Sequence, residues 1–136
     1  MTRDYGMSKG AIMNKEDIRI LVVDDEESIR CVFSDMISLM GFEVAVSGSG
    51  DDALGQFLKS SFDLVLTDLN MPGIDGWTLA RHMKEISPGT RVVLVTGEER
   101  EMTLKKMEDS SVDFALFKPV GLHDVQDTVQ RVLSSH

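Results

Sequence analysis

The sequence predicts an α/β fold: a doubly wound parallel sheet of five strands with helices on both faces. One observation is a set of four apolar runs that each lead into a polar residue: Ile20 to Val23 before Asp24, Leu64 to Thr67 before Asp68, Val92 to Val95 before Thr96, and Phe114 to Phe117 before Lys118. Such runs, bounded by turn residues, are typical of strands buried in a parallel sheet. The other observation is that strand and helix signals alternate five times from residue 18 onward, which indicates right-handed strand–helix–strand units.

The first half of the chain is expected to hold three of these units. Residues 1–17 show no apolar periodicity, and we expect a flexible N-terminal extension there and one domain over 18–136. Strands are expected at 19–24, 43–47 and 62–67, and a turn-rich loop at 70–76 precedes the third helix. Gly41 is expected to end the first helix, and the second helix follows Gly50. Apolar residues at i, i+3, i+4 spacing predict the buried helix faces: Ile29, Val32, Phe33, Met36, Ile37 and Met40; Ala53, Leu54, Phe57 and Leu58; Leu79, Ala80, Met83 and Ile86.

The second half is expected to hold two more units. Ser87-Pro88-Gly89 breaks the third helix, and strands follow at 91–95 and 113–117. The helix near 99–109 has the weakest pattern, because its apolar residues are only Met102, Leu104 and Met107. The last helix, 122–133, is expected to bury Leu122, Val125, Val129, Val132 and Leu133.

Composition excludes several functions. A chain of 136 residues with 42% hydrophobic residues suits one globular domain. A formal net charge of −9 argues against a nucleic-acid partner, which needs a basic patch. Neither a membrane-spanning run nor a signal-peptide core is present, so we expect a cytoplasmic protein without membrane contact. The single cysteine, Cys31, cannot form an internal disulfide or a cysteine-cluster zinc site.

Acidic residues follow the first and third strands. Asp24-Asp25 and Asp68 lie at strand ends, and these two strands are neighbours in a 2-1-3-4-5 sheet, one of the two common doubly wound orders. Their carboxylates would be close enough to share a Mg²⁺ ion, and without a cation their repulsion would raise at least one pKa. An alternative is that Asp25 or Glu26 only caps the following helix.

The segment from Asp68 to Gly76 makes the pattern specific. The sequence resembles the receiver domain of two-component response regulators, of the chemotaxis-receiver type, over residues 18–135. That family has an acidic pair after strand 1, a phosphoacceptor aspartate before a Met-Pro-Gly loop, Ser or Thr after strand 4 and Lys-Pro after strand 5. The chain has each of these in order: Asp24-Asp25, Asp68 with Met71-Pro72-Gly73, Thr96, and Lys118-Pro119. The resemblance implies the flavodoxin-like (βα)5 fold with strand order 2-1-3-4-5.

The resemblance also implies a phosphoacceptor switch rather than an enzyme. Asp68 would take a phosphoryl group from a phosphohistidine, and the aspartyl phosphate would shift the conformation of an output face. Asp24, Asp25, Asp68 and the backbone carbonyl of Asn70 would bind Mg²⁺. The partners would be a sensor histidine kinase or a histidine phosphotransfer protein, and a downstream protein at the face formed by the fourth helix, fifth strand and fifth helix.

Three further residues complete the implied site. Lys118 would pair with one phosphoryl oxygen, Thr96 would donate its hydroxyl to another, and a cis Lys118–Pro119 bond would orient the lysine. From loop position alone, Asn70 and Glu98 would flank the phosphoryl group and tune its lifetime.

Two positions depart from the family pattern. Ala115 stands where receivers usually have Tyr or Phe, which puts the aromatic switch in doubt, and Ser111 replaces a glycine before the fifth strand. Phe114 and Phe117 are expected to be ordinary core residues, with Phe117 on the strand face of Ala115.

Other functions are consistent with parts of this pattern. The chain is either a stand-alone switch or a receiver excised from a longer regulator or hybrid kinase. A pseudo-receiver would act only by binding. A Mg²⁺-dependent aspartyl phosphohydrolase of the haloacid dehalogenase type needs a second aspartate two residues after the nucleophile, where this chain has Asn70.

Overall fold

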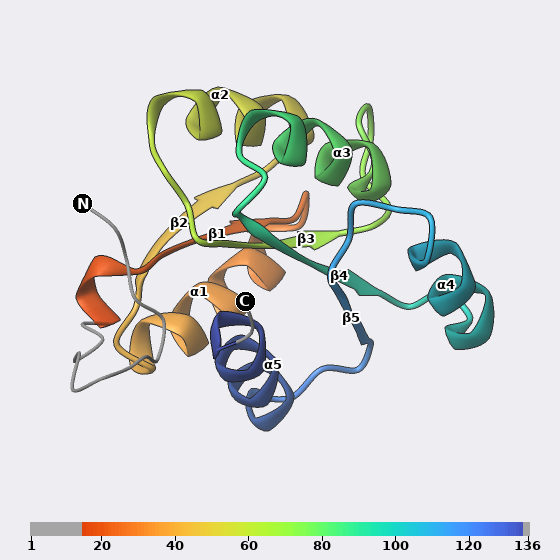
Figure 1. The fold of residues 1–136 in the computed structure, drawn as a ribbon. Helices are drawn as coiled ribbons and strands as arrows, with labels where there is room; N and C mark the ends of the chain where they lie inside the picture. The colour runs from red at the N-terminus through yellow and green to blue at the C-terminus, as the bar shows by residue number, and fades with distance from the viewer. Residues whose placement is uncertain (1–14, 135–136) are drawn as a thin grey trace.

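The computed structural model describes residues 15–134, which form a parallel sheet of order β2-β1-β3-β4-β5 with helices on both faces (Figure 1). The fold class and strand order predicted from the sequence are confirmed. The strands are β1 (Arg19–Val23), β2 (Glu43–Ser47), β3 (Leu64–Asp68), β4 (Arg91–Thr96) and β5 (Phe114–Phe117). The helices are α1 (Glu27–Leu39), α2 (Gly50–Lys59), α3 (Gly76–Ile86), α4 (Arg100–Met107) and α5 (Leu122–Ser134).

The predicted N-terminal extension lies mostly outside the described residues, which begin at Lys15. Its last three residues form a short 3-10 turn, η1 (Lys15–Asp17), whose first residue places its ammonium 5.5 Å from the centre of the Phe42 ring. The flexibility of the extension therefore stays a prediction. None of the helices in the described part of the chain is both long and apolar enough to cross a membrane.

Alternation along the strands divides the core between the two faces of the sheet. Ile20 and Val22 of β1 pack with α1 and α5 on one face, whereas Leu21 and Val23 pack with α2 and α3 on the other. The same alternation in β3 and β4 makes these central strands almost wholly buried. A sheet covered on both faces leaves its carboxyl edge as the place where polar strand-end residues can gather.

Local sequence signals fix the helix ends. Ser49 and Asp75 cap α2 and α3 by accepting hydrogen bonds from the backbone N–H groups of Asp52 and Thr78. Gly41 follows α1 with a φ of +97°, a left-handed conformation that glycine adopts without steric cost, and so ends the helix as predicted.

Four residues predicted to be buried are instead exposed: Val32, Leu58, Ile86 and Leu122. Val32 and Leu58 lie on the flanks of their apolar stripes, whereas Phe33 and Ile37 of α1 are buried in the core. Ile86 and Leu122 are the last and first residues of their helices. Several strand ends also differ by one or two residues; Asp68 and Thr96 each lie within a strand because the backbone pairing continues through them.

Helix α4 is the least firmly packed helix of the described chain. Its only buried residue is Thr103, while Met102 and Leu104 are 73% and 42% exposed. Met107 packs against the smaller core cluster that contains Ala80, Val92 and Leu94. The weak apolar pattern of the sequence therefore corresponds to a helix with little buried apolar surface, and two of its residues, Arg100 and Lys106, lie over aromatic rings.

Candidate functional site

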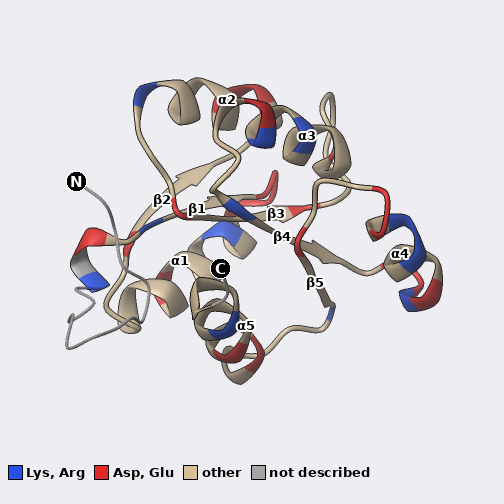
Figure 2. Ribbon diagram, viewed as in Figure 1, with Lys and Arg blue, Asp and Glu red and all other residues tan. Residues whose placement is uncertain are grey.

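Acidic residues, red in the ribbon of Figure 2, lie where β1 and β3 end, at the carboxyl edge of the sheet. Carboxylate oxygens of Asp24, Asp25 and Asp68 all lie within 4.8 Å of one another. Asp24 and Asp68 are buried, at 3% and 8% exposure, whereas Asp25 is exposed. The predicted juxtaposition of the acidic pair with Asp68 is thus present, and it follows from β1 pairing directly with β3.

The loop after β1 is held by hydrogen bonds to its backbone. The N–H of Asp24 donates to the carbonyl of Ser47 at 3.1 Å, and the Arg30 guanidinium donates to the carbonyl of Asp24 at 2.8 Å. Glu26 occupies the cap position of α1 without a side-chain cap bond, and its N–H instead donates to Asp24 Oδ1 at 2.9 Å. The alternative that the Glu26 side chain caps α1 is therefore wrong.

Arg30 was not singled out from the sequence. It lies on α1, and long helical side chains extend toward the helix N-terminus, which brings its guanidinium back to the strand end. A basic residue about one turn after an acidic pair is the signal that could have identified it.

The acidic cluster perturbs the titration of Asp24. Burial is the main cause that raises the pKa of its carboxyl group above the ordinary value of 3.8, and the neighbouring charges of Asp68 and Asp25 raise it further. The hydrogen bond from Glu26 and the charge of Lys118 act in the opposite direction. The predicted raised pKa is thus present, but burial contributes more to it than the carboxylate crowding from which it was predicted. A set of hard oxygen donors that repel one another is the kind of site that divalent Mg²⁺ fits.

Hydrogen bonds on both sides of Asp68 hold the backbone at this position. Thr67 Oγ1 donates to the carbonyl of Asp68 at 2.9 Å, and the N–H of Leu69 donates to the carbonyl of Val95 at 3.2 Å. The loop then returns so that the N–H of Gly76 donates to the carbonyl of Leu69. A Cβ at Gly76 would lie 2.7 Å from the Asp68 carbonyl oxygen, so only glycine permits this close approach.

Lys118 and Thr96 complete the group of polar strand-end residues. Lys118 Nζ lies 3.2 Å from Asp68 Oδ1, with the lysine side chain 38% exposed and that of Asp68 10% exposed. The backbone N–H of Lys118 donates to the carbonyl of Thr96 at 2.8 Å, and the Lys118–Pro119 bond is cis, as predicted. Thr96 is buried, and its Oγ1 accepts from the N–H of Glu98 at 3.0 Å.

The residues expected to flank the site, Asn70 and Glu98, are both exposed. Each lies two residues beyond a buried site residue, Asp68 and Thr96 respectively, at the sheet edge.

The last strand shows one outcome that differs from expectation. Phe114 packs into the core beneath α1 and α5, and Ala115 packs on the opposite face, as alternation predicts. Phe117 is not an ordinary core residue, because the Arg100 guanidinium lies 4.3 Å from the centre of its ring. Sequence reasoning missed Arg100, since nothing in the pattern of α4 shows that one charged residue turns toward β5.

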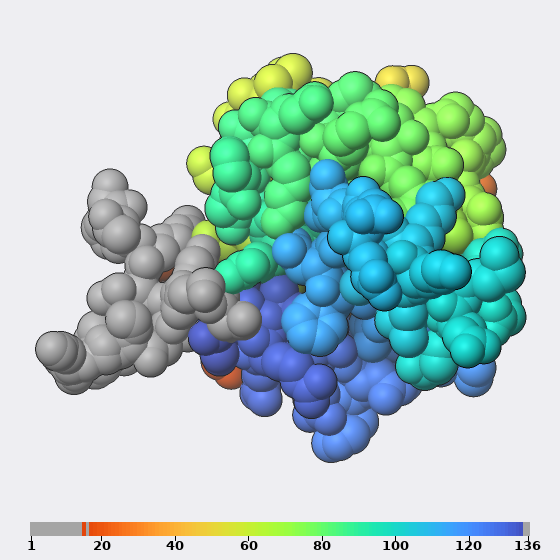
Figure 3. All heavy atoms as spheres, turned by 45° about the vertical axis from the view of Figure 1, so that its right-hand side comes forward, coloured from red at the N-terminus to blue at the C-terminus, as the bar shows by residue number. Residues whose placement is uncertain are grey.

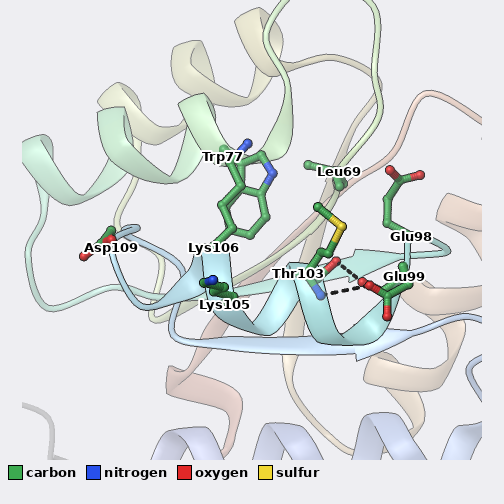
Figure 4. Close-up of a pocket in the computed structure, with 9 residues that line it drawn as sticks. Leu69, Trp77, Glu98, Glu99, Thr103, Lys105, Lys106 and Asp109 are labelled. Carbon is green, nitrogen blue, oxygen red and sulfur yellow. Dashed lines mark hydrogen bonds between the residues drawn. The ribbon is translucent and has the colours of Figure 1, made fainter.

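A cavity of about 500 Å³ lies between α3 and α4 next to the site (Figure 4). Trp77 extends from α3 toward α4, and Glu98 and Glu99 lie at the other end of the cavity. Lys106 Nζ is 5.1 Å from the centre of the Trp77 ring. The face of α4 that is directed toward α3 therefore borders this cavity and is not packed against the core.

Sequence comparison identifies related domains. Residues 20–130 match the family model described as the response regulator receiver domain. The chain is 31% identical over 119 residues to the sensor histidine kinase RcsC of Escherichia coli K12, covering 88% of this chain and 12% of that protein. It is 35% identical over 112 residues to the virulence sensor protein BvgS of Bordetella bronchiseptica, covering 77% of this chain and 9% of that protein. The chain thus spans a small part of the length of these relatives.

Solved structures show the same fold. The chemotaxis protein CheY4 of Vibrio cholerae superposes with a TM-score of 0.80 at 28% identity, covering 85% of this chain and 98% of that one. The response regulator TrrA of Thermotoga maritima, solved in complex with Mg²⁺-BeF, superposes with a TM-score of 0.76 at 27% identity and the same coverage.

Proposed function

The chain belongs to the response regulator receiver domain family, whose members are regulatory phosphoacceptor domains, and from this we propose that Asp68 is its phosphoacceptor. The observation that carries the proposal is the placement of Asp68 within 4.8 Å of two further carboxylates and 3.2 Å from the ammonium of Lys118. In this proposal the chain acts as a switch in a two-component phosphorelay.

The transfer forms one bond and breaks another. A carboxylate oxygen of Asp68 bonds to the phosphorus of a phosphohistidine, the P–N bond breaks, and its electron pair returns to the imidazole nitrogen. Asp24, Asp25, Asp68 and the backbone carbonyl of Asn70 would bind Mg²⁺, which would supply positive charge to balance that of the phosphoryl oxygens. Burial of Asp24 and Asp68 fixes their carboxylates at the strand ends, so little reorganisation is needed.

Lys118 and Thr96 would stabilise the transferred group. The Lys118 ammonium pairs with Asp68 in this structure and would pair with a phosphoryl oxygen after the transfer. The Thr96 hydroxyl accepts a hydrogen bond from Glu98, so its own proton remains available to a second phosphoryl oxygen. Asn70 and Glu98 are proposed to regulate the access of water and thus the lifetime of the aspartyl phosphate.

The similarity to RcsC and BvgS supports a sensor histidine kinase or a histidine phosphotransfer protein as the phosphodonor. We propose a protein partner for the face formed by α4, β5 and α5, two elements of which have exposed apolar side chains, Leu104 in α4 and Leu122 in α5.

The test uses phosphoramidate, a small donor with the P–N bond of phosphohistidine, and follows intact mass in the presence of Mg²⁺. Wild type and the control variant Asp51→Asn, an exposed α2 aspartate, should gain one phosphoryl group, and Asp68→Asn should gain none. No gain in wild type would favour a pseudo-receiver. Repeated turnover of a small phosphomonoester would instead favour a phosphohydrolase.

A further inference from the structure

Helix α4 is attached to the rest of the domain at two points by cations lying over aromatic rings. Arg100, its first residue, lies over Phe117 of β5 at 4.3 Å, and Lys106, near its end, lies over Trp77 of α3 at 5.1 Å. One residue of α4 is buried, and the cavity of about 500 Å³ borders it on the side of α3. In Figure 3, α4 and the segment that follows it form a surface region next to α3. With so little buried apolar area, these contacts are a large part of what fixes the helix.

The contact between Arg100 and Phe117 connects the start of α4 to the strand ends that carry Thr96 and Lys118. Thr96 and Phe117 are paired in register between β4 and β5, and the N–H of Lys118 donates to the carbonyl of Thr96. From Thr96 the chain continues through Glu98, whose N–H donates to the Thr96 hydroxyl oxygen, to the first turn of α4.

The first turn of α4 is itself tied to the preceding residue. Glu99 accepts hydrogen bonds from the N–H groups of Glu101 and Met102 and from the Thr103 hydroxyl. Arg100 then reaches back over Phe117, which directly precedes Lys118. A displacement of the Thr96 hydroxyl therefore moves residue 98 and the start of α4, and the contact between Arg100 and Phe117 resists that displacement.

We propose that Arg100 is a positioning residue for phosphoryl transfer, acting through its contact with Phe117 to restrain Thr96 and the start of α4 in the unphosphorylated conformation. The proposal rests on the proposed function, because it assigns to Thr96 the contact with the phosphoryl group. In this chain the Arg100–Phe117 contact would connect Thr96 to α4. Phe117 lies on the same face of β5 as Ala115, the position where receivers usually have an aromatic residue.

Breaking the contact should shift the equilibrium toward conformations in which Thr96 can turn to the phosphoryl group. A cation–π contact at an exposed site changes a two-state ratio by about two- to five-fold. Arg100→Met keeps the length and packing of the side chain and removes its charge. We expect this variant to be phosphorylated by acetyl phosphate about two- to five-fold faster than wild type.

Three variants make the test specific. Lys105→Met removes the same charge from the same helix and leaves the Phe117 contact in place, so its rate should equal that of wild type. Arg100→Lys keeps a cation and should restore a rate near that of wild type. Phe117→Leu should match Arg100→Met, and the double variant should be no faster than either single variant. Circular dichroism checks that each variant is folded.

Hydrogen exchange of the α4 amides gives a second readout that does not depend on phosphorylation. Exchange near residues 98–103 should be faster in Arg100→Met than in wild type and Lys105→Met. No phosphorylation of wild type would overturn the proposed function, while the exchange data would still support or refute the restraint. Equal rates and equal exchange in Arg100→Met and wild type would overturn the role of Arg100.

Discussion

Replacing Gly76 with alanine tests how the loop after β3 holds Asp68. An added Cβ would lie 2.7 Å from the Asp68 carbonyl oxygen, 3.0 Å from Leu69 Cα and 2.6 Å from Leu94 Cδ1. The leucine methyl can turn away, but the two backbone atoms cannot move freely. Leu69 is hydrogen bonded to Val95 on one side and to Gly76 on the other. The substitution must therefore displace the peptide between Asp68 and Leu69.

The expected cost has two parts. Overpacking of a tight site typically costs about 1–3 kcal/mol, and for a domain of this size each 1 kcal/mol lowers Tm by about 4 °C. Misplacing a reacting group by about 1 Å can cost about 100-fold in rate, so phosphorylation of Asp68 should fall by at least about ten-fold. Gly76→Ala should therefore remain folded while its phosphorylation rate falls strongly.

The chain offers a matched control in Gly55, in the middle of α2. A Cβ there would meet nothing within 4 Å, so Gly55→Ala should stabilise the domain by about 0.5–1 kcal/mol and leave phosphorylation unchanged. Urea unfolding measures stability, and mass gain with acetyl phosphate measures the rate. Wild-type stability and rate in Gly76→Ala would refute the role given to this close approach.

Three other results are expected. Asp24→Asn should raise the stability of the protein in urea unfolding at pH 7 without divalent cations, because the raised pKa means that folding opposes the charged form of the carboxyl group. The gain in stability should appear as the pH rises above 3.8, the ordinary pKa of an aspartate, and should be absent at lower pH. An equal gain in stability at all pH values would contradict this explanation. Mg²⁺ at 100 times its Kd should stabilise the folded wild type by about 2.7 kcal/mol and so raise its Tm. The Tm of Asp24→Asn should rise less, and equal Tm shifts in the two proteins would contradict the assignment of Asp24 as a metal ligand. Asp113→Ala should cost about 1–3 kcal/mol, because Asp113 accepts from the Lys84 ammonium at 2.7 Å and the N–H of buried Val92 at 2.8 Å; an unchanged unfolding midpoint would contradict this.

Strand positions could be predicted because continuous apolar runs indicate strands buried on both faces. The acidic cluster could be predicted because parallel strands place their carboxyl ends at one edge and the common 2-1-3-4-5 order makes β1 and β3 neighbours. The position of Lys118 beside Asp68 follows the same logic, with strand β5 next to β4.

The extent of burial could not be predicted from periodicity alone. An apolar stripe tells which side of a helix faces the sheet, but the sheet edge decides which flank residues it covers, as the exposure of Val32 and Leu58 shows. The contacts of Arg30 and Arg100 were missed for a related reason. Long charged side chains choose partners in three dimensions, and the sequence gives their charge without the direction in which they turn.

The central claim is that Asp68 accepts a phosphoryl group with the help of a cation bound by the neighbouring carboxylates. The most direct measurement is intact mass after acetyl phosphate treatment, with and without Mg²⁺, for wild type and Asp68→Asn, with the product trapped before hydrolysis. We predict one added phosphoryl group in wild type only, and only with Mg²⁺. No gain in folded wild type, an equal gain in Asp68→Asn, or a gain that is independent of Mg²⁺ would contradict the claim.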